Sequence, residues 1–394
     1  MSTELLQTYP VPLLRNFEVQ YLKPLLQNYI PNFNKIFNET PGTNSWVKIS
    51  SILDQKIREG FDDSDLEKEL FEKLVFELPD HVYLLPLETE IDANEFMERY
   101  SGLPVVNRKI SSILYTEEKL ITVRKFENKI IFLYRYGTTN VGDIKASLYV
   151  PCIIDFDNNF VFIKTRMHYV KKSETSIQSI IEDIINETNS QLDFELSVST
   201  FNPSYLHEAL YKLFRDESIK AEKIIKENMD DLTETELEKK INTFLKEELK
   251  IKEPDNYTDR VKSAFYQDRS LQMDNNQFYD GFIFAFTFFD REFTRSSTRS
   301  SQREPIYNKK IYWNLKDLIH NYQELTDISL YWKFDKNDFT KTPEGEDFSF
   351  VEVSFREKNG SLEIHFYNSK SDRRVKEEYV IYKIKDYIWP KDIS

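Results

Sequence analysis

The chain has a single cysteine, Cys152, and only eight glycines in 394 residues. One cysteine excludes a disulfide within the chain and zinc sites built from several cysteines. The glycines form no GxGxxG or Walker pattern, and there is no GxSxG nucleophile elbow. Ordinary Rossmann and P-loop nucleotide sites, and hydrolases with that elbow, are therefore not predicted.

Metal-ligand spacing is missing as well. The five histidines form no HExxH or other paired spacing. The stretch DFDNNFVFIKTR begins like a calcium loop, but Phe160 stands where the loop needs glycine and Arg166 where it needs glutamate. A hairpin turn is the better interpretation, so the sequence predicts no metal site and no cofactor.

Long apolar runs are also missing. No window approaches the ~20 uncharged apolar residues that a membrane span needs, and the first residues show no secretory pattern. We therefore expect a cytoplasmic protein without membrane contact. The formal net charge of -14 opposes nucleic-acid binding over the whole surface, although a local basic patch is compatible with it. Abundant Asn, Lys, Ile, Phe and Tyr are typical of an AT-rich genome and suggest a bacterial source.

What is present is material for large cores, since 40% of the residues are hydrophobic and 14% are aromatic. The length exceeds what one core usually serves, so we expect an α+β protein in three parts. These are a mainly helical region at 1–105, an antiparallel sheet with a helical extension at 106–257, and a C-terminal α+β domain at 258–394.

The first part shows helical spacing. VQYLKPLLQNYIPNFNKIF carries apolar residues at that spacing, with turns or kinks expected at Pro24 and Pro31. In SDLEKELFEKLVFELP, Ser64 and Glu67 have the spacing of a capping box, and Pro79 ends the pattern. Both stretches predict helices with one apolar side.

From about Arg108 the apolar period changes to two. Successive strands are predicted at KISSILY, KLITVRKF, KIIFLYRY, SLYVPCIIDF and FVFIKTRM, with ENK and DNN as turns. Helical spacing returns in TSIQSIIEDIINETNS, HEALYKLFRDESIKAEKIIKENM and TELEKKINTFLKEELKIKEP. The prediction is a meander of about five strands followed by exposed helices or a helical hairpin.

The last part mixes both periods. GFIFAFTFFD predicts a strand with one buried aromatic face, formed by Phe282, Phe284, Phe286 and Phe288. NLKDLIHNYQEL predicts a helix, and ISLYWKFD and FSFVEVSFRE predict strands. Asn359-Gly360 between alternating runs predicts a type I′ hairpin. EYVIYKIKDYI predicts a final strand.

One catalytic interpretation stays open. Metal-dependent nucleases hold a divalent ion beside a D/E-x-K element, whose lysine helps to orient the attacking water. Asp143 and Lys145 have that spacing, and Glu127 precedes them in a neighbouring predicted turn. An exposed turn explains the same residues, because Asp-x-Lys is common in charged proteins and Gly142 favours a loop. The alternative function is therefore a divergent nuclease that uses Mg²⁺ or Mn²⁺.

The segment FAFTFFDREFTRSSTRSSQREP contains the main candidate for binding. Its arginine ladder consists of Arg291, Arg295, Arg299 and Arg303, which recur every four residues in a run almost free of acids. Spacing of four keeps these side chains on one side of a strand. Intervening serines and threonines oppose a stable helix, and guanidinium groups beside hydroxyls suit phosphates or acidic protein surfaces. The competing interpretation is a solvated loop.

These observations favour a binding protein over an enzyme. We expect a non-catalytic interaction subunit that works with a protein partner or as a homo-oligomer. The arginine ladder is expected to contact nucleic acid or an acidic protein. The composition and the missing metabolic motifs favour a setting in bacterial antiviral defence.

Overall fold

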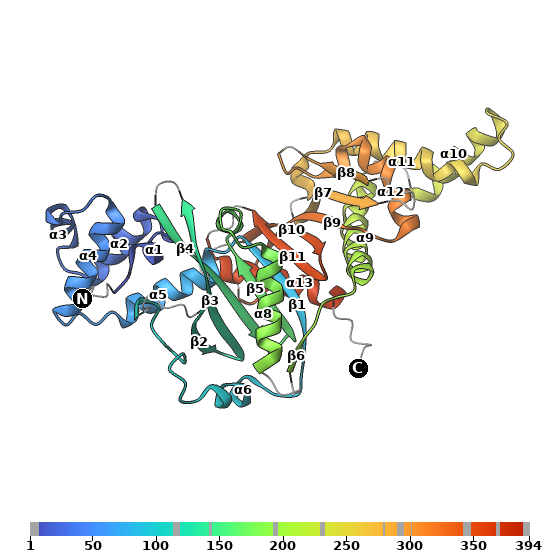
Figure 1. Ribbon diagram of the computed structural model, residues 1–394. Helices are drawn as coiled ribbons and strands as arrows, with labels where there is room; N and C mark the ends of the chain where they lie inside the picture. Colours follow the sequence, from blue (N-terminus) through green and yellow to red (C-terminus); the bar gives the residue numbers. More distant parts are fainter. Residues whose placement is uncertain are drawn as a thin grey trace. The chain divides into compact units, whose positions relative to one another are not determined.

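The computed structural model describes residues 8–112, 119–141, 144–191, 196–228, 233–278, 280–289, 295–300, 302–341, 348–367 and 371–388. Helices and antiparallel strands are both abundant, which confirms the predicted α+β class. The chain forms two compact units, unit 1 at 1–200 and unit 2 at 201–394 (Figure 1). The three-part division stays a prediction about which segments fold independently.

Unit 1 begins with helices, as the apolar spacing predicts. They are α1 (Val11–Leu14), α2 (Val19–Tyr29), α3 (Phe33–Glu39), α4 (Ser45–Arg58) and α5 (Ser64–Glu72), followed by a π-helical turn at Lys73–Glu77. Pro24 lies inside α2. The helices are tied to the strands, because Asn16 Nδ2 donates to the Ser147 carbonyl at 3.1 Å and Arg166 Nη1 donates to the Asn16 carbonyl at 2.8 Å. The N-terminal helices and the strands of residues 81–198 therefore share one unit.

The capping box predicted for Ser64 and Glu67 is wrong. The N-cap of α5 is Asp63, which makes no side-chain capping hydrogen bond. Glu67 is buried, and its carboxylate accepts from the Ile110 backbone amide at 2.9 Å and pairs with Arg124 at 2.5 Å. The Glu67 carboxylate therefore binds Ile110 and Arg124, which are distant in the sequence, and does not cap the start of α5.

The sheet of unit 1 runs in the order β2-β3-β4-β5-β1 with antiparallel neighbours, and β6 pairs with β1. Its strands are β1 (His81–Thr89), β2 (Leu120–Phe126), β3 (Lys129–Val141), β4 (Ile144–Asp155), β5 (Phe160–Thr165) and β6 (Leu196–Val198). The ENK and DNN turns are confirmed, with Glu127 and Asn159 at φ of 55° and 56°. The Asp155 carboxylate accepts from the backbone amides of Asp157 and Asn158 at 3.0 and 3.1 Å. The calcium-like stretch is therefore a hairpin turn, as predicted.

One strand predicted in unit 1 is wrong, and one strand of unit 1 was not predicted. Residues Ile110–Ser112 of KISSILY form a short 3-10 helix, and residues 113–115 lie outside the described residues. The sequence does not reveal β1, because this strand is buried on both faces and shows no apolar alternation. Pro86 also argues against a strand there, yet it pairs with Phe160 of β5 and its carbonyl accepts from the Ser199 amide at 3.3 Å.

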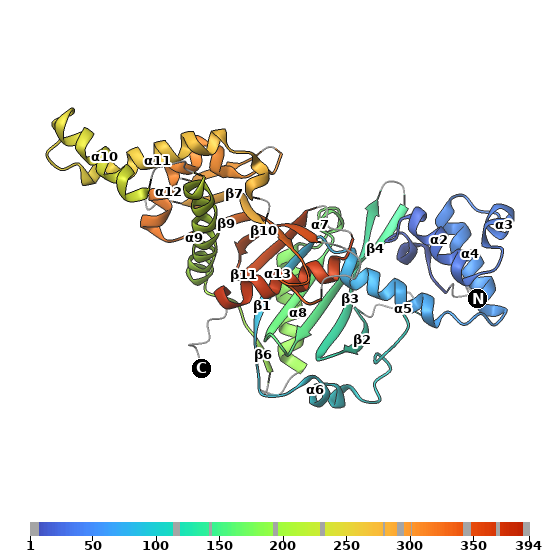
Figure 2. The same cartoon turned by 180° about the vertical axis from the view of Figure 1, so that it is seen from behind.

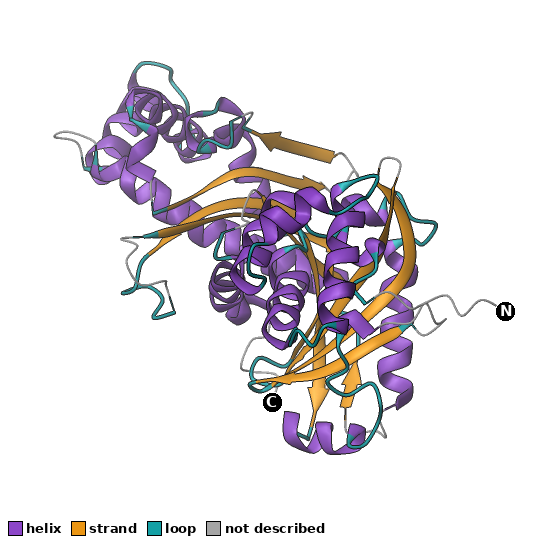
Figure 3. Cartoon of the chain, turned by 90° about the vertical axis from the view of Figure 1, so that its left-hand side faces the viewer, coloured by secondary structure: helices purple, strands orange, loops and turns teal. Residues whose placement is uncertain are grey.

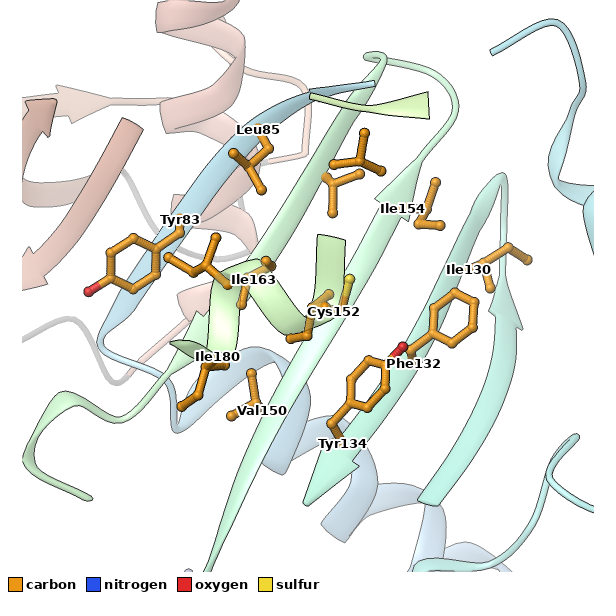
Figure 4. Close-up of a cluster of buried hydrophobic side chains, with 14 of the residues drawn as sticks. Tyr83, Leu85, Ile130, Phe132, Tyr134, Val150, Cys152, Ile154, Ile163 and Ile180 are labelled. Carbon is orange, nitrogen blue, oxygen red and sulfur yellow. The ribbon is translucent and has the colours of Figure 1, made fainter. Parts of the chain in front are cut away.

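The core of unit 1 lies between the sheet and the helices α6 (Ala93–Tyr100), α7 (Met167–Val170) and α8 (Ile177–Gln191). Figure 4 shows Cys152 of β4 in this core, with Val150 of the same strand and Ile180 of α8 nearby. Burial raises the pKa of the Cys152 thiol well above its ordinary value. Because a thiol kept protonated is a poor nucleophile, Cys152 is a packing group.

Buried tyrosines are expected to make unit 1 sensitive to alkali. Burial, with a smaller contribution from Glu187, raises the pKa of Tyr100 to about 12 and raises the pKa of Tyr134 further. Unfolding returns both to ~10, so their contribution to stability is present below pH ~10 and is lost as the pH rises through the folded values. We expect tyrosinate absorbance from this group to appear together with the loss of circular dichroism. Complete ionisation while the circular dichroism stays native would contradict this.

Unit 2 combines helices with antiparallel strands (Figures 2 and 3). The helices are α9 (Pro203–Glu227), α10 (Glu234–Glu247), α11 (Asp255–Gln272), α12 (Lys310–Tyr322) and α13 (Arg373–Ile388). The strands, in sheet order, are β11 (Ser361–Tyr367), β10 (Ser349–Lys358), β9 (Asp327–Phe334), β7 (Gly281–Phe289) and β8 (Arg295–Arg299). Asn359 and Gly360 have φ of 52° and 74°, which confirms the type I′ hairpin between β10 and β11. In the described residues no helix is long and apolar enough to cross a membrane.

The final strand predicted at EYVIYKIKDYI is wrong, because these residues belong to α13. Their alternation of lysine with aromatic and β-branched residues resembles a strand locally. The buried side chains Tyr379, Val380, Ile384 and Ile388 instead recur at helical spacing. Tyr379 stacks on Phe334 of β9 with ring centroids 3.9 Å apart. Packing against the sheet therefore determines that these residues form a helix.

Candidate nucleic-acid interface

The two faces of the unit 2 sheet differ. One face packs against helices: Phe286 meets Phe214 of α9 edge-on at 5.4 Å, and Trp332 meets Tyr379 of α13 at 6.3 Å. Strand pairing places a second set of side chains on the opposite face. We call it the polar face, and the residues that lie on it include Phe282, Arg299, Tyr331, Phe350, Glu352 and Tyr367.

A bulge in β7 determines which side chains reach the polar face. The pairing of β7 with β9 shifts between Ile283 and Ala285, so that Phe284 is an extra residue. As a result, Phe282 lies on the polar face whereas Phe286 packs on α9. The prediction that four phenylalanines share one buried face is therefore wrong, because a bulge reverses the alternation of side chains beyond it.

Three of the four ladder arginines are placed by the structure, and Arg291 lies outside the described residues. Arg295 and Arg299 are the first and last residues of β8, and both are exposed. The two-residue period of the strand puts them on the same face. β8 pairs with β7 and stands last in the strand order of the described residues. Arg303 follows the strand with a φ of 57°.

Two arginines of the ladder gather around one tyrosine ring. Arg299 Nη2 donates to the Tyr367 hydroxyl at 2.6 Å. The guanidinium carbon of Arg303 lies 4.5 Å from the centroid of the same ring, and Arg303 also forms an ion pair with Glu352. The ring therefore orients two guanidinium groups, and the Glu352 carboxylate offsets the charge of one of them.

An aromatic row crosses three neighbouring strands on the polar face. Phe282 stacks on Tyr331 with centroids 4.8 Å apart and planes 13° from parallel, and Tyr331 stacks on Phe350 at 5.8 Å and 22°. Burial, with the nearby Glu352 carboxylate, raises the pKa of Tyr331, so its hydroxyl stays neutral at ordinary pH. Phe350 is 47% exposed at the end of the row.

The aromatic row is a feature that the sequence analysis misses. A signal was available in FSFVEVSFRE, where strict alternation puts Phe350 on the same side of the strand as Glu352 and Ser354. Such a position predicts an aromatic side chain on a polar face. The partners Phe282 and Tyr331 could not be found in the same way, because their contact depends on the pairing of β7 with β9.

Among the residues that the structure describes, positive charge exceeds negative charge on the polar face. Its cationic side chains, with Arg303 beside them, are Arg295, Arg299, Arg303, Lys333, Arg356 and Lys358. Its acidic side chains are Asp327, Glu352 and Glu363. Part of the positive charge is paired: Arg356 donates to Asp327 from Nε and Nη2 at 2.8 and 2.6 Å. The local excess is nevertheless opposite in sign to the net charge of -14.

Two residues of the nuclease alternative, Lys145 and Glu127, lie near opposite ends of β3. Lys145 is exposed near the start of β4, where it pairs with Asn140 of β3. Glu127 precedes Lys129, the first residue of β3. At ~3.3 Å per residue, the part of β3 from Lys129 to Asn140 spans roughly 36 Å. Asp143 lies outside the described residues, so its place in the nuclease alternative stays a prediction.

The described residues and the comparisons with known proteins do not by themselves identify a function. Within the described ranges, no group of three or more His, Cys, Asp or Glu side chains could hold a metal ion. No protein-family model, curated protein or solved structure matches the chain. The interpretation therefore depends on the residues of the polar face.

Proposed function

We propose that this chain is a non-catalytic subunit of a larger assembly, and that it binds the phosphate backbone of nucleic acid on the polar face of unit 2. One observation carries the proposal. β8 presents Arg295 and Arg299, both exposed, on a sheet face where the described cationic side chains outnumber the described acidic ones. The proposed setting, antiviral defence in a bacterial cytoplasm, is supported by residue composition alone.

The chemistry of the arginines supports this choice of partner. A guanidinium group has five N–H donors in a planar fork that matches two phosphate oxygens. The hydrogen bond from Arg299 to Tyr367 uses one nitrogen and leaves other donors of the fork for a ligand. Glu352 competes with phosphate for Arg303, so we expect Arg295 and Arg299 to contribute more to binding.

Replacing Arg295, Arg299 and Arg303 together with Gln is expected to weaken nucleic-acid binding and its dependence on salt. Each lost phosphate contact lowers the slope of log affinity against log salt by about 0.7–0.9, which gives a drop of about 2.1–2.7 units for three contacts. Fluorescence anisotropy of a labelled oligonucleotide over a salt series measures this slope. Circular dichroism checks that the variant is folded.

A matched control removes the same charge from another surface. Lys223, Lys239 and Lys246 are exposed on α9 and α10, and their replacement with Gln should leave the slope unchanged. Equal weak binding by the wild type and the arginine variant would contradict the proposal. Association with an acidic protein that nucleic acid cannot displace would favour the acidic-partner alternative.

The same samples test the nuclease alternative. The oligonucleotide is incubated with the protein and Mg²⁺ or Mn²⁺, and its length is then checked. We expect it to stay intact. Cleavage that is lost in a folded Asp143→Ala variant would replace the proposed function with that of a nuclease.

A further inference from the structure

We infer that the nucleic acid held on the polar face is single-stranded, and that one of its bases stacks on Phe350 as the next ring of the aromatic row. The inference rests on the proposed function, because it assumes that the arginines hold a phosphate backbone. The inference adds that the ligand is single-stranded and that Phe350 is the side chain that distinguishes a single strand from a duplex.

The row ends at the ring of Phe350, which is partly exposed and has Lys376 Nζ 5.3 Å from its centroid. Phe282, Tyr331 and Phe350 stack in sequence across β7, β9 and β10, so each inner ring face is covered by its neighbour. Phe350 is the last ring of this row and is 47% exposed. Its partner Tyr331 is half-buried and stacked on both sides, so the row is held in place. A base added to Phe350 would extend an ordered stack.

Exposure of a second ring and a nearby cation strengthens this assignment. Phe348, which precedes β10, is 46% exposed, and Lys333 Nζ lies 4.1 Å from the centroid of its ring. Lys333 pairs across the strands with Phe350. The Lys333 ammonium group therefore contacts one exposed ring, and Lys333 is the cross-strand neighbour of the other, so a nucleotide could place its phosphate near this cation and its base near a ring.

Arg303 of the arginine ladder lies within reach of this end of the row. Glu352, the ion-pair partner of Arg303, is two residues from Phe350 on the same strand and the same face, a separation of ~7 Å. Cationic groups on one side and a ring face on the other are the two elements that single-strand binding needs. A duplex can use the cationic groups but not the ring face, because its bases are already stacked and paired.

The test compares labelled single-stranded oligothymidine with a duplex of the same length. We expect the wild type to bind the single strand more tightly. Phe350→Ala should reduce single-strand affinity by roughly 5- to 150-fold, because stacking of one base is worth ~1–3 kcal/mol. Its salt slope should stay that of the wild type, since no phosphate contact is lost. Phe350→Trp should retain binding.

The control and the possible outcomes separate this inference from the proposed function. Tyr382 is 51% exposed on α13, and Tyr382→Ala should leave binding unchanged. If the arginine variant loses binding but Phe350→Ala and the strandedness of the ligand have no effect, the stacking inference is overturned and the proposed function stands. If the arginine variant and Phe350→Ala both bind like the wild type, the proposed function fails as well.

Discussion

Replacing Glu67 with Ala is expected to lower the free energy of unfolding of unit 1 by about 3–5 kcal/mol. The Glu67 carboxylate lies 2.5 Å from Nη2 of Arg124, and the two side chains are only 7% and 16% exposed. The guanidinium carbon of Arg124 is also 3.8 Å from the ring centroid of Phe71. Removing the carboxylate leaves a mostly buried cation without this partner, and leaves the Ile110 amide without its acceptor.

An exposed ion pair provides the control. Glu227 is 62% exposed and lies 3.6 Å from Lys223, so Glu227→Ala should change stability by less than about 0.5 kcal/mol. Two units need not unfold together, so native-state hydrogen exchange in β2 to β5 is the suitable measurement. The double replacement of Glu67 and Arg124 should cost less than the sum of the single ones. Equal losses for Glu67→Ala and Glu227→Ala would show that the buried pair is not formed.

Replacing Tyr379 with Ala is expected to lower the free energy of unfolding of unit 2 by about 3–5 kcal/mol. Tyr379 is 4% exposed on α13. Its ring stacks on Phe334 at 3.9 Å and meets Phe339 at 5.7 Å and Trp332 at 6.3 Å. Truncation therefore opens a cavity where the helix packs on β9, and the neighbouring rings can fill it only in part.

Another tyrosine of the same helix is the matched control. Tyr382 is 51% exposed and contacts Phe339 at 5.8 Å. Tyr382→Ala is expected to cost less than about 1 kcal/mol. Hydrogen exchange of the amides of β9 and β10 compares the two variants. A larger loss at Tyr382 than at Tyr379 would mean that α13 presents a different side to the sheet.

Local patterns were sufficient for much of unit 1 and for the hairpin of unit 2. Alternating residues and a short polar turn specify a hairpin by themselves, since the two strands are adjacent in the chain. That is why the turns at Glu127, at Asn159 and at Asn359-Gly360 are where the sequence predicts them. The long amphipathic stretch of α9 was equally readable, because its apolar residues repeat over several turns.

Local patterns failed where a distant contact outweighs them. The residues of α13 alternate like a strand, but burial of Tyr379 and Ile384 against the sheet makes them helical. The capping-box spacing at Ser64 was misleading because Arg124, far along the chain, takes the Glu67 carboxylate. In both cases the free energy of a buried contact exceeds the few tenths to ~1 kcal/mol of a local preference.

The sequence by itself determined the α+β class, the antiparallel hairpins and the spacing of the ladder arginines, because each of these depends on neighbours within a few residues. Only the tertiary structure decided what surrounds those arginines. Arg303 meets Glu352 and Tyr367, and the ring of Phe350 joins a row with Phe282 and Tyr331. Strand order and a bulge in β7 create these contacts between residues far apart in the chain, and no local period encodes a strand order.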